Sequence, residues 1–475
     1  MIKKYLQQYA VAESTRVARL IKSLQQPGWD AVLVIPAYAE SYSSLVKVTQ
    51  LIRQGGQSLP QEAKGPVVDR LLQIWVINAP DNAPEELLLL TQECWDQCLA
   101  ASQTICAEQH DYLQRFAFGE VLLLDRFSAG LRLPAKQGVG LARKIGGDCA
   151  LALFELGLLR QSWLWYTDAD AVLPEDYFGQ VSQTPASAAA VLYRHQHVLE
   201  GELDQQAAMR LYQAKLDLHV AALERAGSPY AYHSIGSTIA CHFEGYVKVR
   251  GMPCRSGGED FYLLNKLAKV GNVVSLKGNP ILLSGRVSPR VPFGTGPALK
   301  AALSRHSDNA GTEITGNEVS GAAMGIETYH PLIYDLLHEI MLSLPIFWEL
   351  RECPEHALDA MIRAQGACLQ KYQERHSGDL CGQAVGEIDL ECLMGKWTAS
   401  VELLSHVKQM LAKSRDEAAF CRHFHCWFDA FKTLKFIHWW RDQGLHSQPV
   451  DLLQTQRECV KSEVDLVADN RHLNA

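Results

Sequence analysis

Short apolar runs alternate with longer amphipathic stretches through the first third of the chain. Four of these runs have the length and the β-branched or aromatic content of buried strands, and they cover residues 31–35, 74–78, 121–124 and 163–167. Stretches of helical periodicity separate them, the longest at residues 84–118 and 138–158. Strands that alternate with helices of this length predict an α/β domain built on a mostly parallel sheet with crossover helices.

The rest of the chain continues this domain and then becomes helical. Further strands are predicted at residues 189–194, 237–242 and 272–276, and an amphipathic helix at residues 1–25. The polar residues 304–320 are predicted to form a linker or mobile loop, and later periodicity predicts helices at 332–350, 354–375, 390–413 and 417–443. The expected organisation is an N-terminal helix (1–28), an α/β domain (29–300), a linker or mobile loop (301–330) and a helical C-terminal domain (331–475).

Composition narrows the class of protein. At 475 residues the chain is too long for one ordinary core, which favours two domains. Its formal net charge of −8, without a basic block, argues against a sequence-independent nucleic-acid binder. No run approaches the ~20 apolar residues of a membrane span, and the N-terminus lacks the apolar core of a signal peptide. The 13 cysteines show no framework spacing, so we expect reduced thiols and a cytoplasmic protein.

Two carboxylates follow the fourth apolar run. Asp168 and Asp170 stand at its end, and alternate residues of a strand share a face, so both side chains are expected to point into one crevice. In open α/β sheets, ligands bind at the carboxyl ends of the strands. Hard oxygen ligands at that place suit Mg²⁺ or Mn²⁺ holding a substrate diphosphate. The alternative is that both acids are solvated loop residues.

Basic residues open the predicted helix that precedes this strand. Gly138-Val139-Gly140 begins the helix, and Arg143 and Lys144 follow within its first turns. A glycine-rich turn into a helix can bind anions through its free amides, and two cations add attraction for a diphosphate. Arg143 takes the place of the third glycine of a Gly-x-Gly-x-x-Gly motif, which argues against a dinucleotide-binding oxidoreductase. The alternative is that both cations are solvated.

Three blocks of the α/β part lie where predicted strands end or a helix begins. They are Pro36-Ala37-Tyr38-Ala39-Glu40, Asp168-Ala169-Asp170 and Gly257-Gly258-Glu259-Asp260. Together and in this order they resemble family-2 glycosyltransferases of the GT-A fold, and the resemblance covers roughly residues 30–300. It implies an enzyme that uses Mg²⁺ or Mn²⁺ to move a sugar from a nucleoside-diphosphate sugar to a hydroxyl acceptor.

The resemblance assigns the first block to the donor nucleotide. Pro36 and Ala37 are implied to contact the nucleotide. Tyr38 is implied to pack against the base and Glu40 to accept hydrogen bonds, although an acid in the first turn of a helix needs no ligand. Many members of the family carry an aspartate at the end of the second strand to read the base, whereas this chain has Asn78 there. Asn78 is therefore kept as a donor contact, and the identity of the base stays open.

The two acidic blocks provide the expected metal ligands and the base. We expect Asp170 to bind the metal, and Asp168 to bind it as well or to contact the ribose or a metal-bound water. By resemblance, Asp260 takes the proton of the acceptor hydroxyl with Glu259 beside it, which a carboxylate can do as the oxygen attacks. Alternatively, the two acids only balance the dipole of the helix that they begin.

A glycine-rich loop at residues 285–296 completes the expected site. By resemblance its Arg286 and Arg290 bind the diphosphate, and the loop closes over the donor as a lid. His233 precedes a predicted strand on the acceptor side, so it is a candidate for binding acceptor hydroxyls as well as for a structural role. The resemblance also implies a late histidine as a further metal ligand; no histidine lies in this loop, and His306 and His330 are the nearest downstream candidates.

Two other readings of the chain stay open, a sugar nucleotidyltransferase and a non-catalytic GT-A-like domain with a helical partner-binding region. A nucleotidyltransferase usually has a glycine-rich loop and a cation after its first strand, which this chain lacks. Several cysteines and histidines lie on predicted helices: Cys94, Cys98, Cys106, His110 and those of residues 421–426. Their spacing lacks the short turns between ligands that are typical of zinc sites, so we expect them to pack in the core. The donor sugar, the acceptor, the stereochemical outcome and the oligomeric state are left open.

Overall fold

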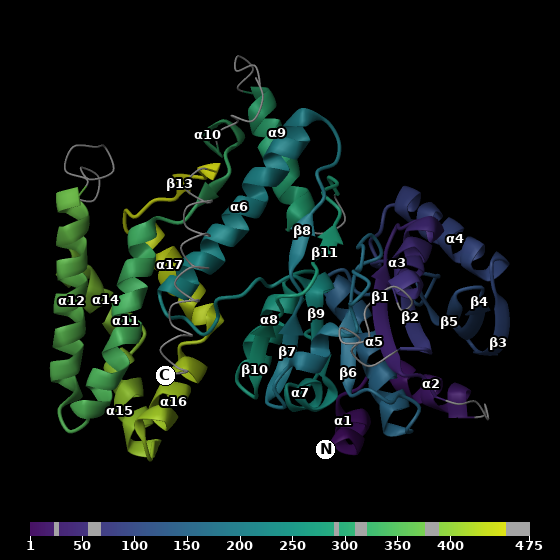
Figure 1. Ribbon diagram of the computed structural model, residues 1–475, viewed down its shortest axis with the longest axis horizontal. Coiled ribbons are helices and arrows are strands. Elements are labelled where there is room, and N and C mark those ends of the chain that lie inside the picture. The colour runs from purple at the N-terminus through teal and green to yellow at the C-terminus, as the bar shows by residue number, and fades with distance from the viewer. Residues whose placement is uncertain (23–27, 56–67, 289–293, 309–320, 376–388, 453–475) are drawn as a thin grey trace. The chain divides into compact units, whose positions relative to one another are not determined.

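The computed structural model describes residues 1–22, 28–55, 68–288, 294–308, 321–375 and 389–452. These residues form two compact units, which Figure 1 shows as one ribbon coloured along the chain. The first unit contains Met1–Glu202 and Ser234–Lys300, and the second contains Leu203–His233 and Ala301–Ala475. Leu203–His233 thus groups with the helical part of the chain, whereas the sequence analysis placed it within the α/β domain.

A nine-stranded sheet organises the first unit, in the order β10-β7-β9-β6-β1-β2-β5-β4-β3. All strands except β4 and β9 run in one direction, so the expectation of an α/β fold with a mostly parallel sheet is confirmed. The strands are β1 (Ala31–Ala37), β2 (Leu71–Asn78), β3 (Gln103–Glu108), β4 (Asp111–Phe116), β5 (Gly119–Arg126), β6 (Trp163–Tyr166), β7 (Ala188–Leu192), β9 (Ile239–His242) and β10 (Asn272–Ser275).

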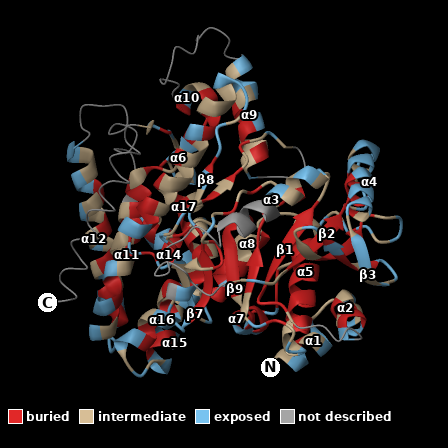
Figure 2. Ribbon diagram, turned by 45° about the vertical axis from the view of Figure 1, so that its right-hand side comes forward, coloured by how far each residue is buried: buried red, intermediate tan, exposed pale blue. Residues whose placement is uncertain are grey.

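Helices cover both faces of this sheet, which is why its central strands are apolar without alternation. Leu33 of β1 packs with Cys94 and Cys98 of α4 (Glu85–Ala100), on the same face as α3 (Tyr42–Gly55). Val34 faces α5 (Gly138–Glu155) on the other side. Figure 2 shows β1, β2 and much of α5 as buried. The core-packing interpretation of the two cysteines is confirmed.

A buried carboxylate ties the N-terminal segment to α5. Asp148 accepts hydrogen bonds from the hydroxyls of Tyr5 and Tyr246 at 2.7 and 2.9 Å and from the Val11 amide at 3.0 Å, and it pairs with Lys144 Nζ at 2.9 Å. Because Val11 is drawn to this carboxylate, the single predicted N-terminal helix is two helices, α1 (Ile2–Gln8) and α2 (Ala12–Lys22). Both pack on α5, as does α8 (Glu259–Leu267), while α7 (Phe243–Lys248) packs on β7 and β9.

The helix predicted at residues 84–118 is wrong in its second half. Helix α4 ends at Ala100, and the following residues form the antiparallel hairpin β3–β4, which turns at Gln109 with a φ of 57°. Cys106 and His110 therefore do not lie on one helix face. The hairpin pairs with β5 through β4, and this tertiary pairing determines the local structure.

Where it is described, the second unit is almost entirely helical, as expected for the C-terminal part. Its helices are α6 (Leu203–Arg225), α10 (Gly321–Met324), α11 (Pro331–Glu349), α12 (Pro354–Arg375), α14 (Leu390–Ser400), α15 (Leu403–Lys413), α16 (Glu417–Trp427) and α17 (Ala430–Asp442), with a small β12 (Glu327–Thr328) and β13 (Gln448–Pro449) sheet. Two predicted helices are each split in two, and α6 was not predicted. Helix α9 (Thr295–Asp308) includes residues 304–308, which were predicted as loop.

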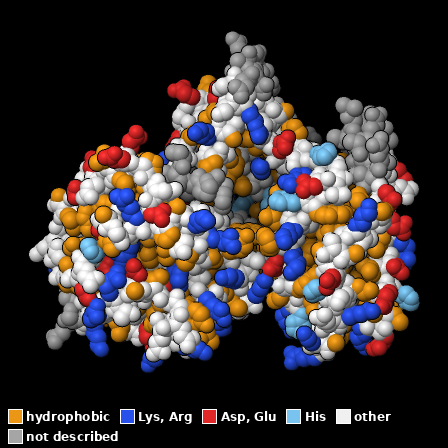
Figure 3. All heavy atoms as spheres, turned by 180° about the vertical axis from the view of Figure 1, so that it is seen from behind, with side chains coloured by type: hydrophobic (Ala, Val, Ile, Leu, Met, Phe, Trp, Pro, Cys, Tyr) orange, Lys and Arg blue, Asp and Glu red, His pale blue; other side chains and the backbone are white. Residues whose placement is uncertain are grey.

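Surface properties of the described residues agree with the composition. Basic and acidic side chains are interspersed over the face that Figure 3 shows. Where the chain is described, no helix has both the length and the apolar character needed to cross a membrane.

Candidate functional site

The Asp168–Asp170 pair lies in a turn at the carboxyl edge of the sheet. Strand β6 ends at Tyr166, the Thr167 amide donates to the Val34 carbonyl at 3.2 Å, and the Ala171 amide donates back to the Asp168 carbonyl at 3.3 Å. We expected strand alternation to orient the two carboxylates, but the turn after β6 orients them instead. Their side chains are 42% and 26% exposed, so both are accessible to a ligand.

Asp168 is bound by an arginine from helix α5. Arg143 Nη2 lies 2.5 Å from Asp168 Oδ1, and Nη1 of the same guanidinium pairs with Glu259 Oε1 at the start of α8. Arg143 is buried. Burial is the largest influence on the Arg143 pKa and lowers it, but the carboxylates of Asp168, Glu259 and Asp260 outweigh burial and raise it. The guanidinium thus stays charged and joins two acidic blocks that are far apart in the sequence.

Asp170 is bound by a second arginine. Arg286 Nη2 lies 2.7 Å from Asp170 Oδ2, and the same nitrogen pairs with Glu40 Oε1. The Arg286 amide donates to Ser284 Oγ at 3.3 Å, and that hydroxyl donates to Glu200 Oε2 at 3.0 Å. Burial lowers the Arg286 pKa, but Asp170 and Glu40 outweigh burial and raise it.

Short strands bring Arg286 to this position. β11 (Ile281–Leu283) pairs with β8 (His195–His197), and Leu282 bridges to Val172, two residues after Asp170. The chain that leaves β11 therefore passes the turn that carries Asp170.

The site thus contains two similar chains of ion pairs. Among the described residues, each aspartate of the pair binds an arginine that also binds a glutamate, giving Asp168–Arg143–Glu259 and Asp170–Arg286–Glu40. Counting only the described residues, these four carboxylates and two guanidiniums sum to a formal charge of −2. An excess of hard anionic oxygen at the carboxyl edge of a sheet is the chemistry that a divalent cation requires.

Asp260 stands beside this arrangement at the start of α8. Gly258 precedes the helix with a φ of 68°, a conformation that a glycine adopts without strain. Asp260 Oδ1 accepts the Phe261 amide at 2.7 Å. Burial is the main cause that raises the pKa of Asp260 to about 7, with the Glu259 carboxylate acting in the same direction and Arg143 opposing it. A carboxyl group with this pKa can accept a proton near neutral pH.

Other residues of the first block have structural partners. Pro36 and Ala37 are the last residues of β1, and Tyr38 packs against the buried core. Ala39 follows with a φ of 50°, and its amide donates to Thr91 Oγ1 at 3.1 Å. This tight turn brings Glu40 to Arg286. Asn78, the last residue of β2, donates from Nδ2 to the Val76 carbonyl at 2.9 Å.

Several expected ligands are not brought into the arrangement. Lys144 donates to the Tyr5 hydroxyl at 2.8 Å and pairs with Asp148, so it helps to hold the N-terminal helix α1 against α5. The Gly140 amide donates to the Arg255 carbonyl at 2.9 Å and is not available for an anion. His233 belongs to the second unit, where it lies 3.4 Å from Asp217. Arg290 lies outside the described residues.

The two histidines considered as metal ligands also have other roles. His306 lies 3.8 Å from Asp204, and His330 caps helix α11 by accepting the Leu332 amide at 3.2 Å. Both residues belong to the second unit.

Gly236 belongs to the site and was not singled out from the sequence. A Cβ at this position would overlap the guanidinium of Arg143. Its φ is not in the positive region, so alanine fits the backbone. A glycine just before a predicted strand is a weak signal that indicates a close backbone approach only when the neighbouring side chain is known.

We expect Gly236→Ala to impair the site while leaving the protein folded. The added methyl meets the far end of a flexible side chain, so Arg143 moves away from Asp168 and Glu259. Nucleotide binding should weaken by about 10-fold or more, the scale of a lost charged hydrogen bond. Calorimetric titration would measure this. Gly366→Ala is the matched control because nothing lies within 4 Å of its added methyl. Unchanged nucleotide affinity in Gly236→Ala would contradict the role of Arg143.

The residues fit a divalent cation by chemistry and charge. Among the described residues, no group of three or more His, Cys, Asp or Glu side chains is already gathered around a single point. Asp168 and Asp170 nevertheless offer accessible carboxylate oxygens, which are the ligands that Mg²⁺ and Mn²⁺ prefer. In this structure each of the two carboxylates binds a guanidinium, and a metal ion could take the place of that cation.

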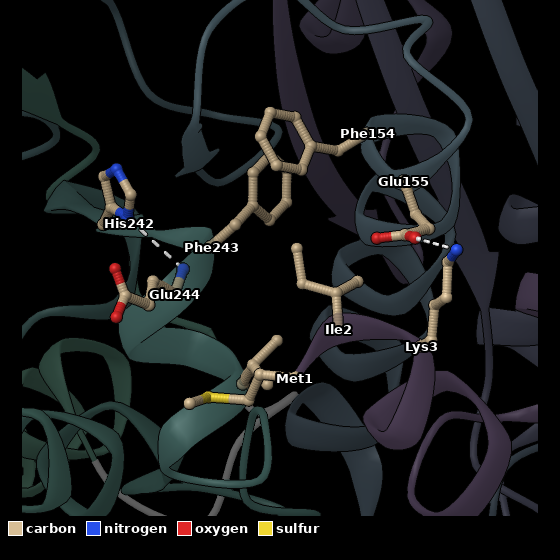
Figure 4. A pocket seen from close by; sticks show the side chains of 9 residues that line it. Met1, Ile2, Lys3, Phe154, Glu155, His242, Phe243 and Glu244 are labelled. Atoms are coloured by element: carbon tan, nitrogen blue, oxygen red, sulfur yellow. Dashed lines mark hydrogen bonds and ion pairs between the residues drawn. The ribbon is translucent and has the colours of Figure 1, made fainter.

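A separate cavity of about 510 Å³ lies at the opposite edge of the sheet. Figure 4 shows Phe154 and Phe243 facing Met1 and Ile2 across it. His242, at its rim, lies 2.7 Å from the Ser162 hydroxyl, just before β6 begins. The cavity therefore lies at the strand end away from Asp168 and Asp170, and it is not part of the site.

No protein-family model matches the sequence, and no curated protein matches it. Among solved structures, the chain is similar to the mannosyltransferase PcManGT from Pyrobaculum calidifontis in complex with GDP-Man and Mn²⁺, with 13% identity, 91% of this chain and 99% of that chain covered, and a TM-score of 0.32. It is also similar to S. aureus TarS 1–349 with UDP-GlcNAc, at 10% identity, coverage of 78% and 92%, and a TM-score of 0.31. A third similar structure is GalNAc-T7 with UDP, GalNAc and Mn²⁺. Its sequence identity is 11%, the match covers 61% of this chain and 52% of that chain, and the TM-score is 0.29. Similarities this low carry no argument about this chain.

Proposed function

We propose that the protein is a metal-dependent glycosyltransferase of the GT-A type, which transfers a sugar from a nucleoside-diphosphate sugar to a hydroxyl acceptor. The observation that carries the proposal is the pair of arrangements Asp168–Arg143–Glu259 and Asp170–Arg286–Glu40 at the carboxyl edge of the sheet. It combines oxygen ligands for a cation with guanidiniums for phosphates, which is the composition that a metal–diphosphate site needs. The described cysteines are all free, which fits the cytoplasmic location that we propose.

In this proposal the donor is held by its diphosphate. Asp170, with Asp168 beside it, would hold Mg²⁺ or Mn²⁺, which when bound would supply positive charge to the leaving diphosphate. Arg143 and Arg286 donate hydrogen bonds to phosphate oxygens, since both guanidiniums lie next to the carboxylates that would hold the metal. We propose that Tyr38, which follows β1, and Asn78, the last residue of β2, contact the nucleoside. Which base they accept is left to experiment.

The acceptor is activated by Asp260. Its pKa of about 7 means that a large fraction is ionised at neutral pH, so it can take the hydroxyl proton as the acceptor oxygen attacks the sugar. Glu259, bound to Arg143, fixes the start of α8 and thereby the position of Asp260. Hydrogen bonds that strengthen as charge develops on the leaving diphosphate then lower the barrier to transfer.

A donor screen tests the proposal and separates it from its rivals. Purified protein is incubated with Mn²⁺ and a panel of UDP-, GDP- and other nucleoside-diphosphate sugars, and the nucleotide products are quantified. We expect slow release of a nucleoside diphosphate from one or a few donors, faster with a suitable acceptor. Formation of nucleoside triphosphate and sugar 1-phosphate in a parallel incubation with added pyrophosphate would favour a sugar nucleotidyltransferase. Lack of any Mn²⁺-dependent binding of nucleotide sugar would favour a non-catalytic partner-binding protein.

A further inference from the structure

Arg286 occupies the side of Asp170 where a metal ion would bind. Its Nη2 atom lies 2.7 Å from Asp170 Oδ2 and contacts Glu40 as well, so one cationic nitrogen already bridges two carboxylates. Its Nε is buried and has no hydrogen-bond partner among the described residues. A guanidinium with an unsatisfied donor retains capacity for a further anionic partner.

From this geometry we propose that Arg286 competes with the metal for Asp170, so that free metal binds weakly and the diphosphate opens the metal site. This inference rests on the proposed function. Without nucleotide, Arg286 holds Asp170, and a metal ion must displace a positive charge to bind there. When a diphosphate arrives, Arg286 has an anion with more oxygens to bind and leaves Asp170 to the metal.

The arrangement makes metal and diphosphate binding cooperative. Each ligand helps the other through the same residue, because the diphosphate removes Arg286 from Asp170 and the metal removes Asp170 from Arg286. Linkage then requires that the diphosphate increase metal affinity by the same factor as the metal increases diphosphate affinity. Arg286 therefore does more than bind phosphate: it prevents a metal ion from occupying the site before the donor arrives.

The two possible roles of Arg286 predict different effects of its removal on the affinity for free metal. A residue that only binds phosphate leaves the affinity for free metal unchanged when it is removed. A residue that competes with the metal raises that affinity when it is removed. We expect Arg286→Ala to bind free Mn²⁺ about 10-fold or more tightly than the wild type, the scale of one charged hydrogen bond, and to show less mutual tightening between Mn²⁺ and nucleoside diphosphate.

The experiment is a titration of Mn²⁺ followed by electron paramagnetic resonance of the free ion, with and without UDP or GDP. Arg286→Gln serves as a second variant that keeps a side chain of similar length without its charge. Arg115→Ala is the matched control, because Arg115 pairs with Glu120 at the start of β5, at the amino edge of the sheet, and its loss removes the same charge. Circular dichroism checks that each variant is folded.

The Mn²⁺ titrations distinguish failure of the Arg286 inference from failure of the proposed function. Tighter free Mn²⁺ binding in both Arg286 variants and not in Arg115→Ala, together with weaker coupling to the diphosphate, supports the inference. If the Arg286 variants bind free Mn²⁺ no more tightly than Arg115→Ala, while wild-type protein still shows diphosphate-dependent Mn²⁺ binding, the inference is wrong and the proposed function stands. If the wild type shows no diphosphate-dependent Mn²⁺ binding with any nucleotide, both are overturned.

Discussion

Asp170→Ala is expected to abolish sugar transfer and Mn²⁺-dependent nucleotide binding while the protein stays folded. The substitution removes the carboxylate expected to hold the metal, and loss of metal stabilisation of the leaving diphosphate should lower the transfer rate by at least about 10³-fold. The cost in stability should be below about 1 kcal/mol, because the Asp170–Arg286 pair is partly exposed. Donor binding with and without Mn²⁺, and the melting temperature, measure the two effects separately.

Glu175→Ala is the control for this variant. Glu175 is an exposed carboxylate further along the same segment, so its removal changes the net charge equally without touching the site. It should bind Mn²⁺ and nucleotide as the wild type does. The metal assignment would be wrong if Asp170→Ala kept Mn²⁺-dependent donor binding at the affinity of the control.

Asp260→Asn is expected to remove transfer, leave donor binding nearly intact and stabilise the protein at alkaline pH. A general base contributes about 10²–10⁴-fold, so transfer should fall by that factor. Because burial chiefly raises the pKa of Asp260 from 3.8 to about 7, the folded protein binds this proton more tightly than the unfolded chain. The resulting stabilisation is complete below about pH 4 and is lost as the pH rises to about 7.

The asparagine variant does not undergo this loss. At pH 8 it should therefore be more stable than the wild type by about 1–3 kcal/mol, and near pH 4 the difference should vanish. In the wild type, transfer should rise with pH through the pKa of Asp260. Glu244→Gln, another acid in the first turn of a helix, controls for a dipole effect and should leave transfer unchanged. Wild-type transfer by Asp260→Asn would show that Asp260 is only a helix-start acid.

The central strands could be predicted from the sequence because their burial leaves a strong pattern. Strand β1 is apolar at every position and buried at every position, so a continuous run identifies it. The β3–β4 hairpin could not be found in this way, since β3 has no buried residue and the turn that follows it contains no glycine. Helix α6 was missed because alanines provide much of its buried face, which weakens its hydrophobic periodicity.

The last predicted helix is split in two at a helix-capping residue that is visible in the sequence, although the hydrophobic periodicity continues through it. Asp429 accepts the Lys432 amide at 3.1 Å and caps α17, and an aspartate before an apolar helical run is a typical N-cap. The break before α15 is less readable, because it depends on Glu402 adopting a φ of 51°.

The candidate site was predictable in its parts and not in its pairings. Strand ends and helix starts place Asp168, Asp170, Glu259 and Asp260 by local rules, and the structure brings them to one edge of the sheet. The Glu40–Arg286 pair joins residues 246 positions apart, and a single sequence contains no signal for such a contact. The two arginines were predicted as phosphate ligands; that each also holds one of the two aspartates follows only from the fold.

The position of Mn²⁺, located by anomalous scattering in crystals grown with UDP or GDP, tests the assignment of Asp170 as the metal ligand. We predict one anomalous peak within coordinating distance of an Asp170 carboxylate oxygen, with the diphosphate bound to it and Arg286 moved from Asp170 to a phosphate oxygen. A bound diphosphate with Arg286 still on Asp170, or with the metal bound elsewhere, would contradict the account.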